Sequence, residues 1–194
     1  TDGINWTAIS SSLTSQTYLN LTQTTQYRAV VRSGVCSEVY SSITTITVNP
    51  KTPQADAKDD QILCNLNSAT LAAVNNLGTN FSGTWTITSQ PVGSTATFSD
   101  ATSPSSTILG LIPGDYVLKW TIAGLAPCID THDEVTITVR PALTTPNAGL
   151  DDKLCDRTST NNSYTLSGNI LRSFETGTWT IIQQPVGSTA TFSK

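Results

Sequence analysis

The single histidine of the chain, His132, lies in the acidic run Asp130–Glu134. A histidine beside carboxylates can act as a general acid or base, or can bind a metal ion. Acid–base catalysis also needs a second catalytic side chain in fixed geometry, and no Ser or Cys nucleophile is placed beside His132. We interpret the run as a solvated loop that precedes a strand. The sequence therefore predicts no catalytic residue and no enzyme activity.

Small groups of carboxylates recur shortly before two of the cysteines. The residues are Asp56, Asp59, Asp60, Asp151 and Asp152. Calcium takes six to eight oxygen ligands, and an ion held by such a group could stiffen the joint with a neighbouring part of the chain. The sequence has no DxDxDG-type loop, so a solvated acidic loop is the alternative interpretation. Calcium at these residues is the only cofactor that the sequence suggests.

The four cysteines are Cys36, Cys64, Cys128 and Cys155. Cysteines can be metal ligands, free thiols or halves of disulfides, and the absence of a CxxC pair makes zinc a poor fit. We predict that Cys64 and Cys128 form a disulfide, and that Cys36 and Cys155 pair with cysteines outside the chain. Disulfides persist in oxidising compartments, so this prediction implies an exported protein.

Period-two alternation of apolar residues predicts strands and places tryptophans within them. Trp85 shares one face of its segment with Ile87, and Trp120 shares a face with Leu118. Tryptophans can also form stacking platforms for sugars, an alternative that extends to Trp6. Because three of them are in phase with aliphatic neighbours, we predict a core position for each. The three are Trp85, Trp120 and Trp179.

A tyrosine follows a Pro-Gly turn at the start of the longest predicted strand. Tyr116 comes directly after Pro113-Gly114-Asp115. In β-sandwiches, a tyrosine at such a place can hydrogen-bond back to the backbone of the preceding crossover, an arrangement called a tyrosine corner. We predict this role for Tyr116 and extend it to Tyr27, which has Leu21 six residues before it.

The chain contains a long internal repeat. Segments 83–100 and 177–194 are identical at 15 of 18 positions, reading GTWTITSQPVGSTATFSD and GTWTIIQQPVGSTATFSK. Trp85 and Trp179 are 94 residues apart. A period of this length is that of one small domain, so the chain is a tandem array.

The repeat divides the chain into three parts. We name them the N-terminal segment (1–50), the central unit (51–141) and the C-terminal segment (142–194). The central unit is predicted to be complete, whereas the two outer segments are expected to be incomplete units. Pro50 and Pro141 close the predicted last strands, and proline cannot extend a sheet ladder. Short strands separated by Pro, Gly and Ser turns predict an all-β fold of tandem Greek-key β-sandwiches.

Composition restricts the partners of the chain. It has 34 Thr and 22 Ser among 194 residues and a formal net charge of −4. Thr suits the outward face of strands, and the absence of a Lys/Arg cluster leaves nothing to bind nucleic acid or an anionic membrane. No segment approaches the ~20 apolar residues that cross a bilayer. We therefore expect no nucleic-acid partner and no membrane insertion.

Motifs in the N-terminal segment resemble those of a known family. Segments 1–9 (TDGINWTAI), 21–31 (LTQTTQYRAVV) and 33–36 (SGVC) look like the latter half of Ig-like repeats in very large surface proteins of Bacteroidota. The resemblance implies that residues 1–50 are the C-terminal part of an Ig-like repeat.

The rest of the chain resembles the PKD-like repeats that accompany those Ig-like repeats. The similar motifs are GTWTI, QPVGSTATFS, the segment 111–116 (LIPGDY) and the segment 134–139. The resemblance implies a complete PKD-like sandwich at 51–141 and the N-terminal part of a second one at 142–194. A WDFGDG-like segment of ordinary PKD domains is absent, so properties tied to that segment are not carried over.

The family that combines these repeats is similar to the SprB-type mobile adhesins of gliding bacteria, which are exported by the type IX secretion system. The resemblance implies a stalk segment of a large adhesin at the cell surface, for attachment or gliding motility. Its expected partners are neighbouring repeats of the same polypeptide, surface polysaccharide, or the export and motility machinery. The alternative function is a carbohydrate-binding or spacer module of a secreted hydrolase.

Overall fold

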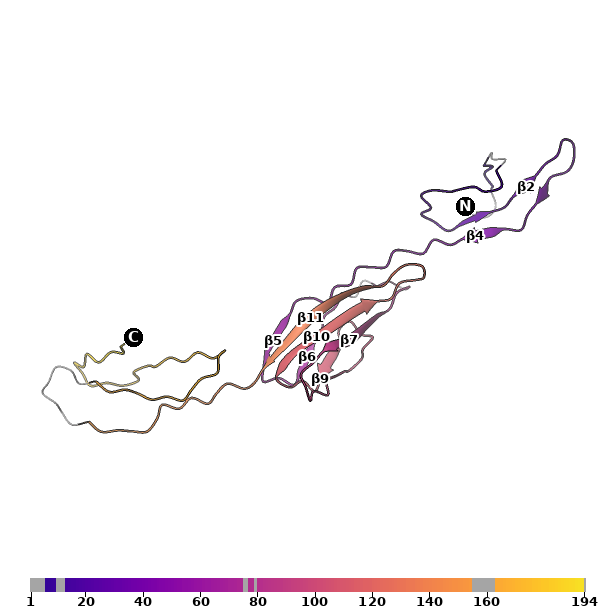
Figure 1. The fold of residues 1–194 in the computed structure, drawn as a ribbon. Helices are drawn as coiled ribbons and strands as arrows, with labels where there is room; N and C mark the ends of the chain where they lie inside the picture. The colour runs from indigo at the N-terminus through magenta and orange to yellow at the C-terminus, as the bar shows by residue number, and fades with distance from the viewer. Residues whose placement is uncertain (1–5, 10–12, 75–76, 79, 155–162, 194) are drawn as a thin grey trace. The chain divides into compact units, whose positions relative to one another are not determined.

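The computed structural model describes residues 6–9, 13–74, 77–78, 80–154 and 163–193. The chain divides into two compact bodies, Thr1–Arg140 and Pro141–Lys194. The described residues form strands and no helix, which confirms the predicted all-β class (Figure 1). No helix in these ranges could cross a bilayer.

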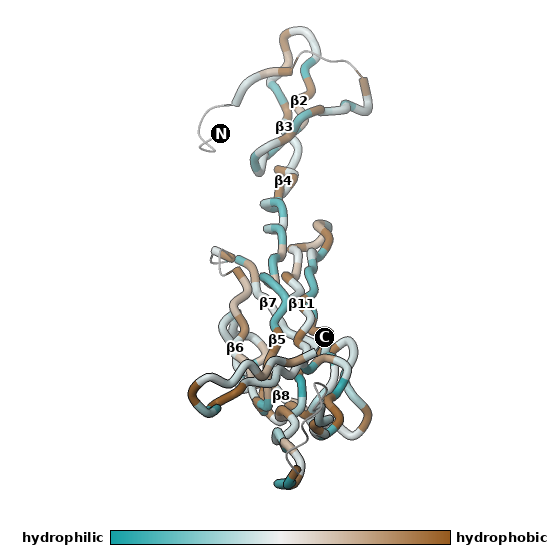
Figure 2. The backbone as a smooth tube through the Cα atoms, turned by 90° about the vertical axis from the view of Figure 1, so that its left-hand side faces the viewer, coloured by the Kyte–Doolittle hydropathy of each residue, from teal (hydrophilic) through white to brown (hydrophobic). Residues whose placement is uncertain are grey.

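Seven strands lie in the part of the central unit that the structure describes. They are β5 (Gln61–Cys64), β6 (Ser68–Thr70), β7 (Gly83–Ser89), β8 (Thr97–Phe98), β9 (Thr107–Leu109), β10 (Gly114–Ile122) and β11 (Thr131–Arg140). Figure 2 colours the backbone by hydropathy, and in β11 a hydrophilic start, residues 131–134, is followed by alternation of Val135, Ile137 and Val139 with Thr136, Thr138 and Arg140. This alternation gives the strand one apolar face, which must be covered by another layer.

The strands form two sheets. The order in the first sheet is β5-β11-β10-β7, and the order in the second is β6-β9-β8. β10 pairs antiparallel with both β11 and β7, whereas β5 pairs parallel with β11. Apolar side chains from both sheets form one core, which includes Ile108 of β9 and Ile137 of β11. The central unit is therefore a β-sandwich, as predicted.

Two tryptophans form the centre of this core. Trp85 of β7 and Trp120 of β10 are opposite each other in the ladder, with ring centroids 5.1 Å apart. Their exposed fractions are 2% and 0%. The predicted core positions of both residues are confirmed. Aromatic side chains of this size dominate the stabilising area of a small core.

Gly83, the first residue of β7, makes room for one of these rings. A Cβ atom at this position would lie 2.0 Å from Cζ2 of Trp120. No side chain larger than hydrogen fits there unless the indole moves. The GTWTI motif must therefore begin with glycine here, because the Trp120 ring of the neighbouring strand occupies the space of a side chain.

The predicted tyrosine corner at Tyr116 is confirmed. Its side chain is fully buried. The hydroxyl accepts a hydrogen bond from the amide of Ile112, at 2.9 Å, and lies 3.0 Å from Oγ of Ser94. Ser94 Oγ also accepts from the amide of Ala96. The corner therefore ties β10 to its preceding crossover and to the turn that follows β7.

The described residues of the N-terminal segment, 6–9 and 13–50, contain four short strands. They are β1 (Thr25–Tyr27), β2 (Val30–Val31), β3 (Val39–Tyr40) and β4 (Thr44–Ile46). They form two two-stranded ladders, β1-β4 and β2-β3. The buried Tyr27 hydroxyl has no hydrogen-bond partner, so the predicted tyrosine corner at this residue is wrong.

The described part of the C-terminal segment, 142–154 and 163–193, contains no strand. Trp179 is 43% exposed, so its predicted core position is wrong. The reason is the missing cover. Trp85 is buried against Trp120 of β10, whereas no strand of the described residues pairs with the segment that contains Trp179.

Candidate functional site

The β10–β11 loop (123–130) contacts the chain where it approaches the sandwich. Nδ2 of Asn49 donates to the carbonyl of Ala126, at 2.7 Å, and Oγ1 of Thr52 donates to the carbonyl of Ile129, at 2.8 Å. The thiol of Cys128 lies 3.6 Å from the carbonyl of Pro50. Several polar contacts thus fasten residues 49–52 to one end of the sandwich.

The same connection continues along β11 through side chains. Oγ1 of Thr131 donates to the carbonyl of Pro53, at 2.6 Å, and accepts from the amide of Ala55, at 3.1 Å. Two residues further along β11, Asp133 accepts from the amide of Ala57 at 2.8 Å. Short polar side chains of β11 therefore replace the backbone ladder over residues 53–57.

The backbone ladder takes over where these side-chain contacts end. Oδ1 of Asp60 accepts from the amide of Thr136, at 2.7 Å, and β5 then pairs with β11 from Gln61 to Cys64. Residues 52–64 thus run parallel to β11 along its length. The chain approaches the central unit at the loop before Thr131 and leaves it after Arg140.

This parallel arrangement determines how the central unit carries tension. Nine residue steps separate Thr131 from Arg140, which corresponds to about 30 Å at a strand rise of ~3.3 Å. Tension between the two ends therefore acts along β5 and β11, in opposite directions on two hydrogen-bonded neighbours. All contacts between them share this shear load, whereas a load across the ladder would break them one at a time.

The predicted disulfide between Cys64 and Cys128 is wrong for this fold. Both thiols are free, as is that of Cys36. Cys64 is the register partner of Arg140 at one end of the sheet, and Cys128 lies beside Pro50 at the other end. Disulfides need Cα atoms within about 7 Å, and the length of β11 separates these two. Nothing in the sequence pattern revealed that the first and last strands are parallel.

The other cysteine predictions remain untested. Cys36 is exposed, and no partner thiol lies beside it among the described residues. Cys155 lies outside the described residues. The prediction of an oxidising compartment depended on a disulfide between Cys64 and Cys128, and both of these thiols are free.

The carboxylates proposed for calcium are not gathered. No group of three or more His, Cys, Asp and Glu residues in the described ranges could hold a metal ion. Asp56 pairs with Nζ of Lys58 at 2.8 Å, and the hydrogen bond from this side chain holds the pKa of the Asp56 carboxyl below its ordinary value. The Asp60 carboxylate accepts a hydrogen bond from the amide of Thr136. These carboxylates serve as local acceptors.

The remaining members of the predicted calcium set lie in the C-terminal segment. Asp152 accepts from the amide of Lys153, at 2.7 Å. This hydrogen bond, aided by one from Tyr164, lowers the pKa of the Asp152 carboxyl. Asp151 and Asp152 both line a surface hollow with Trp179. The structure does not bring Asp59 into any metal-binding group.

His132 lies on β11, not in a loop, which corrects the predicted position of the run Asp130–Glu134. The side chain is exposed, and its register partner is Thr121. Glu134 is opposite Lys119 on the same face. Asp130 accepts from the amide of Gly124 at 2.8 Å, within the β10–β11 loop. No Ser or Cys lies opposite His132 on this face, where the cross-strand residues are Thr121 and Lys119.

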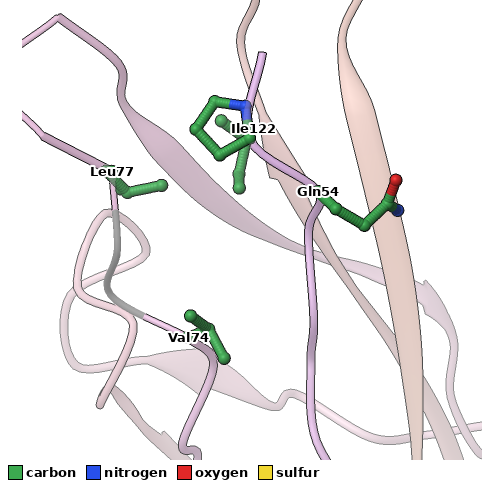
Figure 3. Close-up of a pocket in the computed structure, with 5 residues that line it drawn as sticks. Gln54, Val74, Leu77 and Ile122 are labelled. Atoms are coloured by element: carbon green, nitrogen blue, oxygen red, sulfur yellow. The ribbon is translucent and has the colours of Figure 1, made fainter. Parts of the chain in front are cut away.

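A cavity of about 290 Å³ lies in the central unit. Figure 3 shows Val74, Leu77 and Ile122 around it, whereas the amide of Gln54 extends away from Val74 and Leu77. Pro53 completes the lining. The five described residues of the lining carry no charged or nucleophilic group, so they offer no catalytic chemistry.

One feature of the N-terminal segment escaped sequence reasoning. The guanidinium of Arg28 lies 4.3 Å from the ring centroid of Trp6 and 4.4 Å from that of Tyr40, so the two rings flank the cation. Such cation–π contacts are favourable when the cation lies over the ring face. Glu38 accepts a hydrogen bond from the Tyr40 hydroxyl, which raises the pKa of this phenol. The residues are too far apart in sequence for a local signal.

Comparisons with known proteins match two parts of the chain. A family described as "Domain of unknown function (DUF8696)" matches residues 1–50. No curated protein sequence matches the chain. The PKD domain from KIAA 1837 protein is 25% identical, over 53% of this chain and 99% of that one, with a TM-score of 0.40. The PKD domain of human KIAA0319 is 22% identical, over 55% and 99%, with a TM-score of 0.41. The β-sandwich assignment stands on the strand pairing and the core of this chain.

Proposed function

We propose that the chain is a non-catalytic, load-bearing stalk segment of a large extracellular adhesin. The observation that carries the proposal is the parallel pairing of β5 with β11, which puts the two ends of the central unit at opposite ends of one ladder. A module with this geometry resists stretching because tension loads its terminal strands in shear. An array of such modules transmits force over a distance, which is what a stalk requires.

The tandem repeat supports the same proposal. Segments 83–100 and 177–194 differ at three of 18 positions, which indicates modules used in series. The resemblance of the motifs to SprB-type adhesins extends the proposal to attachment or gliding motility at a bacterial cell surface, with export by type IX secretion. The proposed partners are neighbouring modules, surface polysaccharide, and the export and motility machinery.

Single-molecule stretching tests the load-bearing role. The chain is held either by its ends or across the sheet through Ile62→Cys and Thr88→Cys, two exposed positions on the edge strands β5 and β7, in a background without the native cysteines. We expect the unfolding force of the sandwich to be clearly higher when the ends are pulled. Equal forces in the two directions would exclude the stalk role.

A matched pair of variants locates the mechanical contact. Asp133→Ala removes the acceptor of the Ala57 amide, whereas Glu134→Ala changes an exposed neighbour on the same strand. The first variant should lower the end-to-end unfolding force, and the second should leave it unchanged. If neither variant changes the force, the contacts before β5 do not bear load.

The alternative function, a carbohydrate-binding module of a secreted hydrolase, draws on the N-terminal segment. Trp6 and Tyr40 are 36% and 48% exposed beside Arg28, and exposed aromatic rings can stack on sugars. Sedimentation with insoluble glycans separates the two functions. A stalk segment stays in the supernatant, and a binding module is retained unless Trp6 is replaced by Ala.

A further inference from the structure

The first strand of the central unit is held by parts of the chain that follow it in the sequence. We call residues 52–64, which end with β5, the entry strand. Its hydrogen bonds to β11 run through Thr131 and Asp133 and then through the β5 ladder. In addition, the amide of Val74 donates to the carbonyl of Asp56 at 2.9 Å. All of these partners come after β5 in the chain, so a second copy of the chain can supply the same set.

The entry strand contributes little apolar area to the core. Its buried side chains are small, Thr52, Ala55 and Ala57, at 4%, 4% and 2% exposed. Leu63 is partly buried, and Ile62 is 69% exposed. The β5 ladder is parallel, the less stable type of pairing per residue. Because hydrophobic stabilisation follows the buried apolar area, this strand separates at a lower cost than the strands that carry the core tryptophans.

A short connection with a strained backbone follows the entry strand. Residues 65–67 join β5 of the first sheet to β6 of the second. Asn65 has φ of 52°, in the left-handed region where a Cβ atom crowds the following carbonyl. The amide of Asn65 donates to the carbonyl of Arg140 at 2.8 Å, within this turn. An extended connection removes the strain, and short strained connections favour exchange of the element that they hold.

We propose that two copies of this chain exchange entry strands, so that residues 52–64 of each copy complete the sandwich of the other. The receiving surface is the edge of β11 with the side chains of Thr131 and Asp133. The contacts of the closed monomer form again in the exchanged dimer, and residues 65–67 become extended. Exchange of an identical element is a low-cost route to a dimer because strand and site are already complementary.

This inference does not rest on the stalk role of the chain. It concerns the partner of β11, which is the entry strand in the monomer and in the exchanged dimer alike. In a stalk, the exchanged strands join two chains side by side through their β5–β11 contacts. Equal unfolding forces in the two pulling directions would thus exclude the stalk and leave the exchange unaffected.

Cross-linking after refolding tests the exchange on the full 194-residue chain. Ile62 and Thr138 are register partners in β5 and β11. One chain carries Ile62→Cys and the other Thr138→Cys, and the native cysteines of both are replaced by Ser. The two chains are unfolded in urea, mixed and refolded together at high concentration under mild oxidation. The exchanged dimer brings the two new thiols together, so a covalent dimer should form.

A cysteine outside the register is the matched control. Thr86 is exposed on β7, at the opposite edge of the same sheet. A mixture of the Ile62→Cys and Thr86→Cys chains should give at least roughly tenfold less covalent dimer than the register pair, because disulfides need Cα atoms within about 7 Å. Equal yields for the two pairs, or no covalent dimer with the register pair, would overturn the proposal.

Variants of the connection test whether strain favours the exchange. Asn65→Gly relieves the left-handed conformation of the monomer, whereas Asn65→Val opposes it. The ratio of dimer to monomer, measured by light scattering after gel filtration, should be roughly tenfold or more higher for the Val variant than for the Gly variant. Asn67→Val is the control, since the φ angle of Asn67 is not positive, and should behave as the native chain. A monomer in all four proteins, or equal ratios for the Gly and Val variants, would refute the proposal.

Discussion

Two segments of almost identical sequence adopt different structures in this protein. Residues 83–89 form β7 and bury Trp85, whereas residues 177–183 form no strand and leave Trp179 43% exposed. The short turn that follows is the same in both, with matching hydrogen bonds and matching glycine φ angles. The turn is therefore a local property, and the strand is a property of what lies beside it.

The largest expected difference between the two copies concerns the tryptophans. Trp85→Ala removes a fully buried indole from the core and should lower the free energy of unfolding by about 3–5 kcal/mol. Trp179→Ala removes a half-exposed ring and should change it by less than about 0.5 kcal/mol. Urea denaturation followed by far-UV circular dichroism measures both. Similar losses would contradict the contrast between the copies.

The second largest difference should be in the stability cost of replacing the glycine that begins each GTWTI motif. Gly83→Val forces a side chain against the Trp120 ring and should cost about 3 kcal/mol, the upper range for overpacking a core. Gly177→Val meets only the end of the flexible Leu171 side chain and should cost little. Thermal unfolding of the two variants compares them directly. If the Gly83→Val variant has the same melting temperature as the native protein, the position of the Trp120 ring does not depend on a glycine at residue 83.

The buried hydroxyl of Tyr116 is hydrogen-bonded, whereas the buried hydroxyl of Tyr27 is not. Tyr116→Phe removes a buried hydroxyl that contacts Ile112 and Ser94, and should cost about 1 kcal/mol or more. Tyr27→Phe is the matched control, since the buried Tyr27 hydroxyl has no partner and its removal should cost nothing. Chemical denaturation of both variants measures the change in the free energy of unfolding that each substitution causes. An unchanged midpoint for Tyr116→Phe would remove the corner as a stabilising contact.

The smallest expected effect concerns Asp100, a position at which the copies differ in sequence. The hydrogen bond from the Thr102 hydroxyl lowers the pKa of the Asp100 carboxyl below its ordinary value of 3.8. The folded state therefore prefers the carboxylate, and this contribution is present above pH 3.8 and lost as the pH falls through the lower pKa.

Asp100→Asn should therefore reduce the loss of stability on acidification, because the variant has no carboxylate to protonate at this position. Urea midpoints at neutral pH and at about pH 2.5 measure the difference between variant and native protein. Equal acid sensitivity of the two proteins would show that the Thr102 contact does not stabilise the carboxylate.

The sequence predicted the elements of the central unit well because its signals are local. Alternation identified β7, β10 and β11 and placed Trp85 and Trp120 inside. The Pro-Gly turn before Tyr116 predicted its corner because the tyrosine bonds only four residues back. Burial also needs a covering layer: the same alternation predicted a core position for Trp179, which is 43% exposed.

Predictions that required distant parts of the chain to meet also failed. Cys64 and Cys128 were expected to pair, but the parallel contact of β5 with β11 separates them by the length of a strand. The contact of the Arg28 guanidinium with the rings of Trp6 and Tyr40 was not anticipated, because the three residues lie far apart in the sequence. Both outcomes depend on topology, which side-chain periodicity does not encode.

By itself the sequence determined the turns, the alternation of the strands and the repeat, since each depends on backbone preference and side-chain order over a few residues. Tertiary structure alone decided which copy of GTWTI becomes a strand, where the thiols lie and in which direction the central unit bears load. The physical reason is that a strand gains its backbone hydrogen bonds and buries its apolar face only against a partner strand. Residues 83–87 have that partner in β10, and residues 177–181 have none among the described residues.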